Sequence, residues 1–200
     1  MIAGLLAAGV RHFTGVQARW FGCDPDTTQR VYFANHTSNL DFLVLWSVLP
    51  SNARSQTRPV AASDYWRGGS LRFFLADRIF RGVLIERKKV TRSNNPMDQL
   101  VPVLQGGESL IIFPEGGRTT ETDMRPFKSG LYHLAKAMPT VDLVPVYIDN
   151  ANRALPKGEF LPIPLLCSAN FGTPLRLLPD EPKDIFLMRA RAAVEALAKT

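Results

Sequence analysis

The fold of this chain is decided by residues 30–49, which read RVYFANHTSNLDFLVLWSVL. The first five residues are rich in β-branched and aromatic side chains, and they predict a short buried strand over 30–34. The last ten are mostly apolar and predict a helix over 40–49, while the polar residues between them predict a turn. A strand that passes through a turn into a helix is the basic unit of α/β proteins.

The same alternation of short and long apolar segments continues to the end of the chain. Further strands are predicted over 58–62, 82–86, 109–113, 141–148 and 167–171, and further helices over 70–80, 96–105, 129–137 and 184–199. The chain has 200 residues and 46% hydrophobic content, enough for one substantial core. We therefore predict a single α/β domain with a mixed, mostly parallel sheet flanked by helices.

The amino-terminal residues 1–21 are predicted to form a short amphipathic helix ahead of the main domain, residues 22–200. The apolar segment 1–10 has half the length needed to span a bilayer. On a helical wheel Arg11 lies opposite an apolar face, which is formed by Ile2, Leu5, Leu6, Gly9, Phe13, Val16 and Trp20. This face suits contact with a membrane surface, and packing against the domain itself is the alternative.

Positive charge is concentrated in one part of the chain. The formal net charge is +6, and residues 51–95 contain ten basic and three acidic side chains. The basic residues alternate with aromatic and aliphatic ones, a mixture that favours a lipid surface over nucleic acid, for which no recognition motif is present. A solvated face on ordinary core helices is the alternative. Cys23 and Cys167 are far apart and predict neither a disulfide framework nor a zinc site, so reduced thiols in the cytosol are expected.

The turn after the first predicted strand holds His36 and Asp41. A histidine can remove a proton from a hydroxyl, and an aspartate can hold the imidazole in the required tautomer. On a continuous helix the two would lie about 140° apart and could not pair. If Ser38 or Asn39 caps a helix that begins near residue 40, however, Asp41 lies in its first turn and faces back toward His36. A capping aspartate beside an incidental histidine is the alternative.

Two further motifs follow predicted strands and are expected at the same edge of the sheet. Residues 113–119 read FPEGGRT, in which two glycines let backbone amides approach an anion and Arg118 can bind a phosphate in a bidentate manner. Residues 82–87 read GVLIER and end with Arg87. Ligands of α/β proteins usually bind at the carboxyl ends of the strands. A tight turn with a surface arginine and a solvated strand end are the alternatives.

Together these motifs resemble the glycerolipid acyltransferase family, typified by 1-acylglycerol-3-phosphate (lysophosphatidate) acyltransferase. The segment 35–41, NHTSNLD, is similar to the catalytic block of that family, with its His-x4-Asp motif. Segments 82–87, 113–119 and 144–146 are similar to its second, third and fourth blocks, and segment 127–130, FKSG, resembles the stretch before the last of them. The resemblance covers roughly residues 22–174, so residues 22–200 are expected to be the acyltransferase domain.

The resemblance implies a role for each matching residue. His36 would be the general base and Asp41 would orient it, so that an acceptor hydroxyl attacks the thioester of acyl-CoA or acyl-carrier protein. The implied substrate-binding residues are Arg87, Glu115, Gly116, Gly117, Arg118 and Lys128, with the two arginines on the acceptor phosphate. The strand around residues 144–146 would line the acyl channel. Neither a metal ion nor a cofactor is implied. A serine nucleophile at Ser38 is disfavoured, because the chain has no Gly-x-Ser-x-Gly motif.

The expected product is therefore phosphatidate, made from 1-acylglycerol 3-phosphate by an enzyme held peripherally on the cytoplasmic face of a membrane. Gly117 stands where the family usually has threonine, which leaves another lysophospholipid, glycerol 3-phosphate or an aminolipid as alternative acceptors. A lipid-binding protein with an inactive site is the alternative outside enzymes.

Overall fold

The structure is a computed structural model that describes residues 2–63, 74–86, 94–118, 124–151 and 166–199. Its strands form one seven-stranded sheet in the order β1-β7-β6-β2-β5-β3-β4. They are β1 (Gln17–Trp20), β2 (Arg30–Ala34), β3 (Thr57–Ala62), β4 (Val83–Ile85), β5 (Ser109–Ile112), β6 (Asp142–Asp149) and β7 (Ser168–Phe171). Strand β7 is antiparallel to β6, and the five strands from β6 to β4 run parallel to one another. The predicted mixed, mostly parallel sheet is confirmed.

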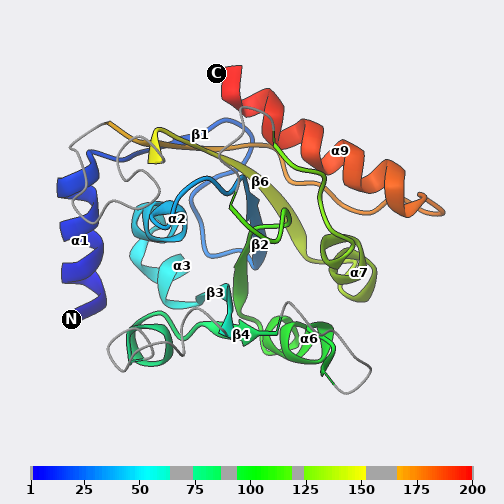
Figure 1. Cartoon of the computed structure of the whole chain (residues 1–200), viewed down its shortest axis with the longest axis horizontal. Coiled ribbons are helices and arrows are strands. Elements are labelled where there is room, and N and C mark those ends of the chain that lie inside the picture. Colours follow the sequence, from blue (N-terminus) through cyan, green and yellow to red (C-terminus); the bar gives the residue numbers. More distant parts are fainter. Residues whose placement is uncertain (1, 64–73, 87–93, 119–123, 152–165, 200) are drawn as a thin grey trace.

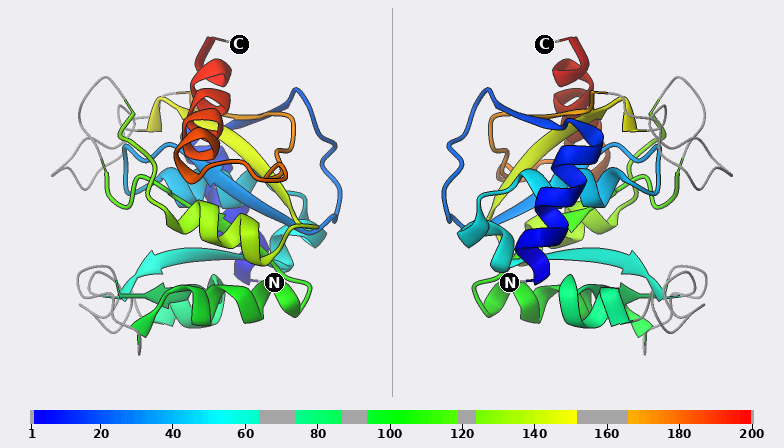
Figure 2. Two further views of the ribbon diagram at one scale, coloured as in Figure 1. Left: turned by 90° about the vertical axis from the view of Figure 1, so that its right-hand side faces the viewer. Right: turned by 90° about the vertical axis from the view of Figure 1, so that its left-hand side faces the viewer.

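Helices cover both faces of the sheet (Figures 1 and 2). They are α1 (Ile2–Thr14), α2 (Asp41–Val48), α3 (Ser51–Ser55), α6 (Met97–Gln105), α7 (Gly130–Ala137) and α9 (Lys183–Ala196), with a π-helical segment η1 (Leu75–Ile79) and a 3-10 turn η3 (Leu197–Lys199). Figure 1 shows α1 and α2 on one side of β2 and β6, and α6, α7 and α9 on the other. A single α/β domain results.

The central strand β2 is buried along its whole length because both of its faces are covered. Tyr32 and Ala34 pack in a core with α1 and α2, whereas Val31 and Phe33 pack in a second core with α6, α7 and α9. Alternate side chains of a strand point to opposite faces, so a strand covered on both faces is apolar throughout. This explains why residues 31–34 form an unbroken apolar run.

The predicted amino-terminal helix is correct at its start but wrong in its length. Helix α1 ends at Thr14, because Gly15 follows with a φ of +56° and Leu166 packs against it. Residues 17–20 instead form β1, which pairs with β7 and stacks Trp20 on Phe171 with ring centroids 3.8 Å apart. The expectation that Val16 and Trp20 lie on an apolar helix face is therefore wrong.

Among the other predicted elements, the strands and the helices near residues 40, 96, 129 and 184 agree with the structure to within a few residues. The helix predicted over 70–80 lies partly outside the described residues, and its described part, η1, is π-helical. Helix α3 was not predicted. The strand expected over 82–86 is shorter, and Arg87 lies outside the described residues.

Candidate active site

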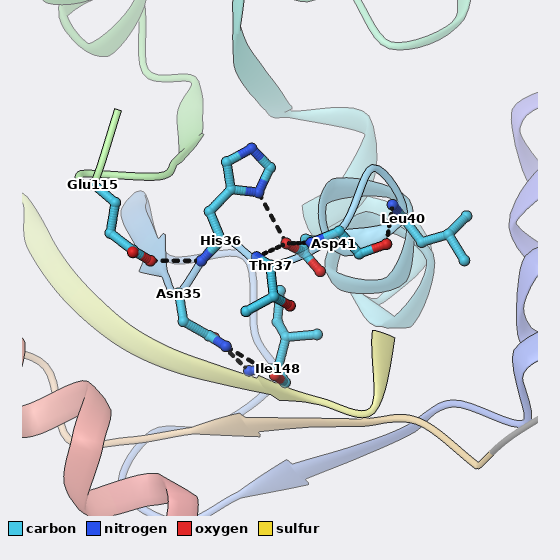
Figure 3. Close-up of polar contacts among 8 residues, drawn as sticks. Asn35, His36, Thr37, Leu40, Asp41, Glu115 and Ile148 are labelled. Atoms are coloured by element: carbon cyan, nitrogen blue, oxygen red, sulfur yellow. Dashed lines mark hydrogen bonds and ion pairs between the residues drawn. The ribbon is translucent and has the colours of Figure 1, made fainter. Parts of the chain in front are cut away.

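The turn between β2 and α2 brings His36 and Asp41 together (Figure 3). His36 Nδ1 lies 2.8 Å from Asp41 Oδ2, and the same oxygen accepts hydrogen bonds from the backbone N–H groups of Thr37 and Ser38, at 2.6 and 2.8 Å. Asp41 is fully buried in the first turn of α2 and faces back toward β2, as predicted. Its charge is thereby matched to three donors and to the positive end of the helix.

The expected cap of α2 takes a different form. Leu40 occupies the N-cap position, and no side chain caps the helix there. The Asp41 carboxylate instead accepts hydrogen bonds from the Thr37 and Ser38 amides. Ser38 Oγ in turn accepts a hydrogen bond from the Leu40 N–H at 3.2 Å. The turn is therefore stabilised by the same carboxylate that orients the histidine.

The His36 ring is held on its face as well as at its edge. It stacks on Phe113, with centroids 4.3 Å apart and planes inclined by 22°. Because Nδ1 is paired with the Asp41 carboxylate, the neutral tautomer places the lone pair on Nε2. The His36 side chain is 20% exposed, so its imidazole ring can be reached from solvent. The arrangement can serve as a general base.

The main chain around His36 is tied to both neighbouring strands. Asn35 Nδ2 donates to the Ile148 carbonyl at 2.9 Å, and the Ile148 N–H donates to Asn35 Oδ1 at 2.7 Å, which connects the turn to β6. The His36 N–H donates to Glu115 Oε1 at 2.7 Å, which connects it to the turn after β5. The turn that carries His36 is thus fixed from two sides (Figure 3).

Glu115 is buried, with 4% of its surface exposed. Its second oxygen, Oε2, accepts a hydrogen bond from the Arg125 N–H at 3.1 Å. Burial raises the pKa of the Glu115 carboxyl, and the hydrogen bonds from the His36 and Arg125 amides oppose that rise. The carboxylate therefore faces the protein main chain.

The glycine turn lies beside this carboxylate. Gly116 has a φ of +71°, and the side chain of Lys128 packs within 2.6 Å of the place where a Cβ would stand. Lys128 donates its backbone N–H to the Pro114 carbonyl at 2.8 Å. Gly117 has open space around it, and Arg118 is exposed. The structure thus places Gly116, Gly117 and Arg118 in the turn after β5, where Glu115 contacts the His36 main chain and the Lys128 side chain packs against Gly116.

The sequence did not single out three contributors to the site. Asn35, Phe113 and Arg125 act through hydrogen bonds or ring stacking that depend on which strands are neighbours. The available signal for Asn35 was a polar residue directly after a buried strand. In the described part of the chain, no group of three or more His, Cys, Asp or Glu side chains could hold a metal ion.

Comparison with known proteins shows which family this chain resembles. Residues 24–149, more than half of the chain, match the model of the family described as Acyltransferase. A 1-acyl-sn-glycerol-3-phosphate acyltransferase alpha of Mus musculus is 30% identical over 163 residues, which are 79% of this chain and 54% of that protein. The protein of the same name from Homo sapiens is 29% identical over 154 residues, 74% of this chain and 51% of that protein.

Two other similarities widen the comparison. A protein named Taffazin from Dictyostelium discoideum is 29% identical over 147 residues, covering 67% of this chain and 49% of that protein. The crystal structure of the 1-acyl-sn-glycerophosphate (LPA) acyltransferase from Thermotoga maritima superposes with a TM-score of 0.75 at 16% identity, covering 99% of this chain and 78% of that one. That likeness shows a common fold. This chain spans about half the length of the curated relatives that it matches. Because the family model matches residues 24–149, this chain belongs to the Acyltransferase family.

Proposed function

We propose that this protein transfers a fatty acyl group from a thioester to the free hydroxyl of 1-acylglycerol 3-phosphate, giving phosphatidate. The observation that carries the proposal is the 2.8 Å pair of His36 and Asp41 at the carboxyl edge of a parallel sheet. The names of the two mammalian relatives supply the substrate class. Acyl-CoA and acyl-carrier protein are both proposed as donors, since each presents the same thioester.

The proposed reaction uses one base and no covalent intermediate on the protein. His36 Nε2 removes the proton from the acceptor hydroxyl as the hydroxyl oxygen attacks the thioester carbonyl carbon. The carbon–sulfur bond then breaks, and the thiolate takes the proton from the imidazolium. The buried Asp41 carboxylate favours that imidazolium while it lasts. We propose that the reaction needs no metal ion or other cofactor, because base and thioester provide all the chemistry.

The acceptor phosphate is proposed to bind at the glycine turn. Arg118 and Lys128 bring two positive charges to this turn. Arg87, which lies outside the described residues, is proposed as a third phosphate ligand because its motif resembles the second block of the family. A phosphate-bearing acceptor is therefore preferred over a neutral one. Because Gly117 has no side chain, another lysophospholipid, glycerol 3-phosphate or an aminolipid is the second candidate for the acceptor.

The protein is also proposed to act on the cytoplasmic face of a membrane as a peripheral protein. Its acceptor and product are lipids, and α1 exposes Ile2, Leu5 and Phe13 by 63%, 68% and 53%. Among the described residues, the structure has no helix with the length and apolar character required to traverse a bilayer. Attachment through the apolar surface of α1 fits these observations.

The test is release of free thiol from palmitoyl-CoA or from acyl-carrier protein, with lysophosphatidate in detergent micelles. We expect release that depends on the acceptor and that falls at least ~10²-fold in His36→Ala, because a positioned general base contributes at least that much. His133→Ala is the matched control, since His133 is exposed on α7. An unchanged rate in His36→Ala would contradict the mechanism. Intact lipid binding with no turnover on any donor would favour the lipid-binding alternative.

A further inference from the structure

The carboxylate of Glu115 is directed at the protein main chain, although its motif predicts a substrate-binding residue. Oε1 accepts from the His36 N–H and Oε2 accepts from the Arg125 N–H, at 2.7 and 3.1 Å. Only 4% of the residue is exposed. A substrate hydroxyl would have to compete with two backbone donors, and a substrate phosphate would be repelled by the negative charge. Neither suits a direct contact with the acceptor.

The hydrogen bond from His36 to Glu115 holds the backbone amide of the residue that carries the imidazole. The preceding residue, Asn35, is bonded to Ile148 of β6, and Asp41 is bonded to Nδ1 of the imidazole. Glu115 supplies the connection on the β5 side, which the main chain does not make because β2 has already ended at Ala34. Without it, the His36 N–H would lose its acceptor, and the main chain that carries the histidine would keep its bonds to β6 and to Asp41 but lose its connection to the β5 side.

The second hydrogen bond explains how this connection stays rigid. The Arg125 N–H belongs to the segment that leads to Lys128, and the Lys128 N–H is bonded to the Pro114 carbonyl. The Glu115 carboxylate is thus held by the His36 amide on one side and by the Arg125 amide, which follows the glycine turn, on the other. A single buried carboxylate therefore couples the position of the base to the shape of the turn that is proposed to hold the acceptor.

We propose that Glu115 is a positioning residue, which fixes the His36 main chain against the β5 turn and does not bind the acceptor. The assignment rests on the proposed acyl transfer for its kinetic test, and its structural part stands independently of that function. A positioning role for Glu115 predicts that its substitution changes kcat, whereas a role in acceptor binding predicts that it changes KM.

The kinetic test compares Glu115→Gln with Arg118→Ala. The glutamine amide can accept from only one of the two N–H groups and turns a donor toward the other. We expect kcat to fall about 10- to 100-fold, as for a small misplacement of a catalytic group. The KM for lysophosphatidate should change by less than about twofold. Arg118→Ala should show the opposite pattern, with a raised KM. A raised KM at retained kcat in Glu115→Gln would overturn the assignment.

The second test reads the His36 amide directly and needs no activity. Hydrogen exchange followed by NMR should show faster exchange at the His36 N–H in Glu115→Ala, which removes both acceptor oxygens, while the amides of Tyr32 and Ile111 in β2 and β5 keep their protection and report an intact fold. Unchanged protection at His36 would overturn the assignment even in an active enzyme. If no acceptor is acylated by the wild-type protein, the proposed function fails, whereas this exchange result still decides the role of Glu115.

Discussion

At the scale of single residues, the two adjacent glycines in the turn after β5 have different conformational requirements. Gly116 has a φ of +71°, which L-residues rarely adopt, whereas Gly117 has an ordinary backbone and open space where a Cβ would stand. Gly116→Ala should therefore destabilise the protein by about 1–2 kcal/mol, the cost of a left-handed conformation. The contact with the Lys128 side chain adds little, because its flexible end can move.

Gly117→Ala is the matched control for this prediction. It restricts the unfolded chain without straining the folded one, so it should be neutral or stabilising by up to about 1 kcal/mol. Urea denaturation of both variants measures the two free energies of unfolding. Equal losses of stability in the two variants would show that the turn is not strained at Gly116.

The residues of the site that could be predicted are those whose partners are close in the sequence. His36 and Asp41 are five residues apart, and the change from strand to helix between them was sufficient to predict their pairing, which the structure confirms. The direction of Glu115 depends on the pairing of β2 with β5, where Phe33 lies opposite Ile112. No local pattern contains that register. The roles in catalysis and in substrate binding remain predictions.

At the scale of elements, Asn35 extends the contact between β2 and β6 beyond the last main-chain pair, Ala34 with Val146. Asn35→Ala leaves the buried Ile148 N–H and carbonyl without their partners, and each unsatisfied group costs about 1–3 kcal/mol. We expect a clear loss in the free energy of unfolding, measured in urea.

Asn170→Ala provides the comparison for Asn35→Ala. Asn170 is also buried, but its side chain makes one hydrogen bond, to the Leu197 carbonyl at 3.0 Å, and its Oδ1 has no partner. Its removal should cost less than that of Asn35. A larger loss in Asn170→Ala would contradict the view that Asn35 joins the two strands.

The elements that the sequence did not predict are too short to show a hydrophobic period. β1 has four residues that alternate between exposed and half-buried at the sheet edge, and α3 has only five residues. Neither is long enough to show a period. The strands β2 and β5 were clear because helices cover both of their faces, so that every residue is buried. Helix α1 ends at Thr14 rather than near Trp20 because pairing with β7 holds residues 17–20 in a strand.

At the scale of the whole molecule, the two faces of the sheet carry different exposed apolar surfaces. On one side, α1 buries Ala7 against the domain and exposes Ile2, Leu5 and Phe13. On the other side, α9 exposes Ile185 and Met188. Figure 2 shows these helices on opposite faces. Both helices therefore offer large apolar side chains to the proposed membrane contact, and a binding experiment can distinguish them.

The double variant Ile2→Ser/Leu5→Ser separates the two faces. If α1 is the attachment surface, binding to anionic phospholipid vesicles, measured by co-sedimentation, should weaken at least about tenfold, because burying an aliphatic side chain contributes about 1.5–3 kcal/mol. The matched variant Ile185→Ser/Met188→Ser removes two side chains of similar exposure from α9 and should bind like the wild type. Circular dichroism checks that both variants are folded. Weaker binding of the α9 variant alone would place the membrane on the opposite face of the sheet and would contradict attachment through α1.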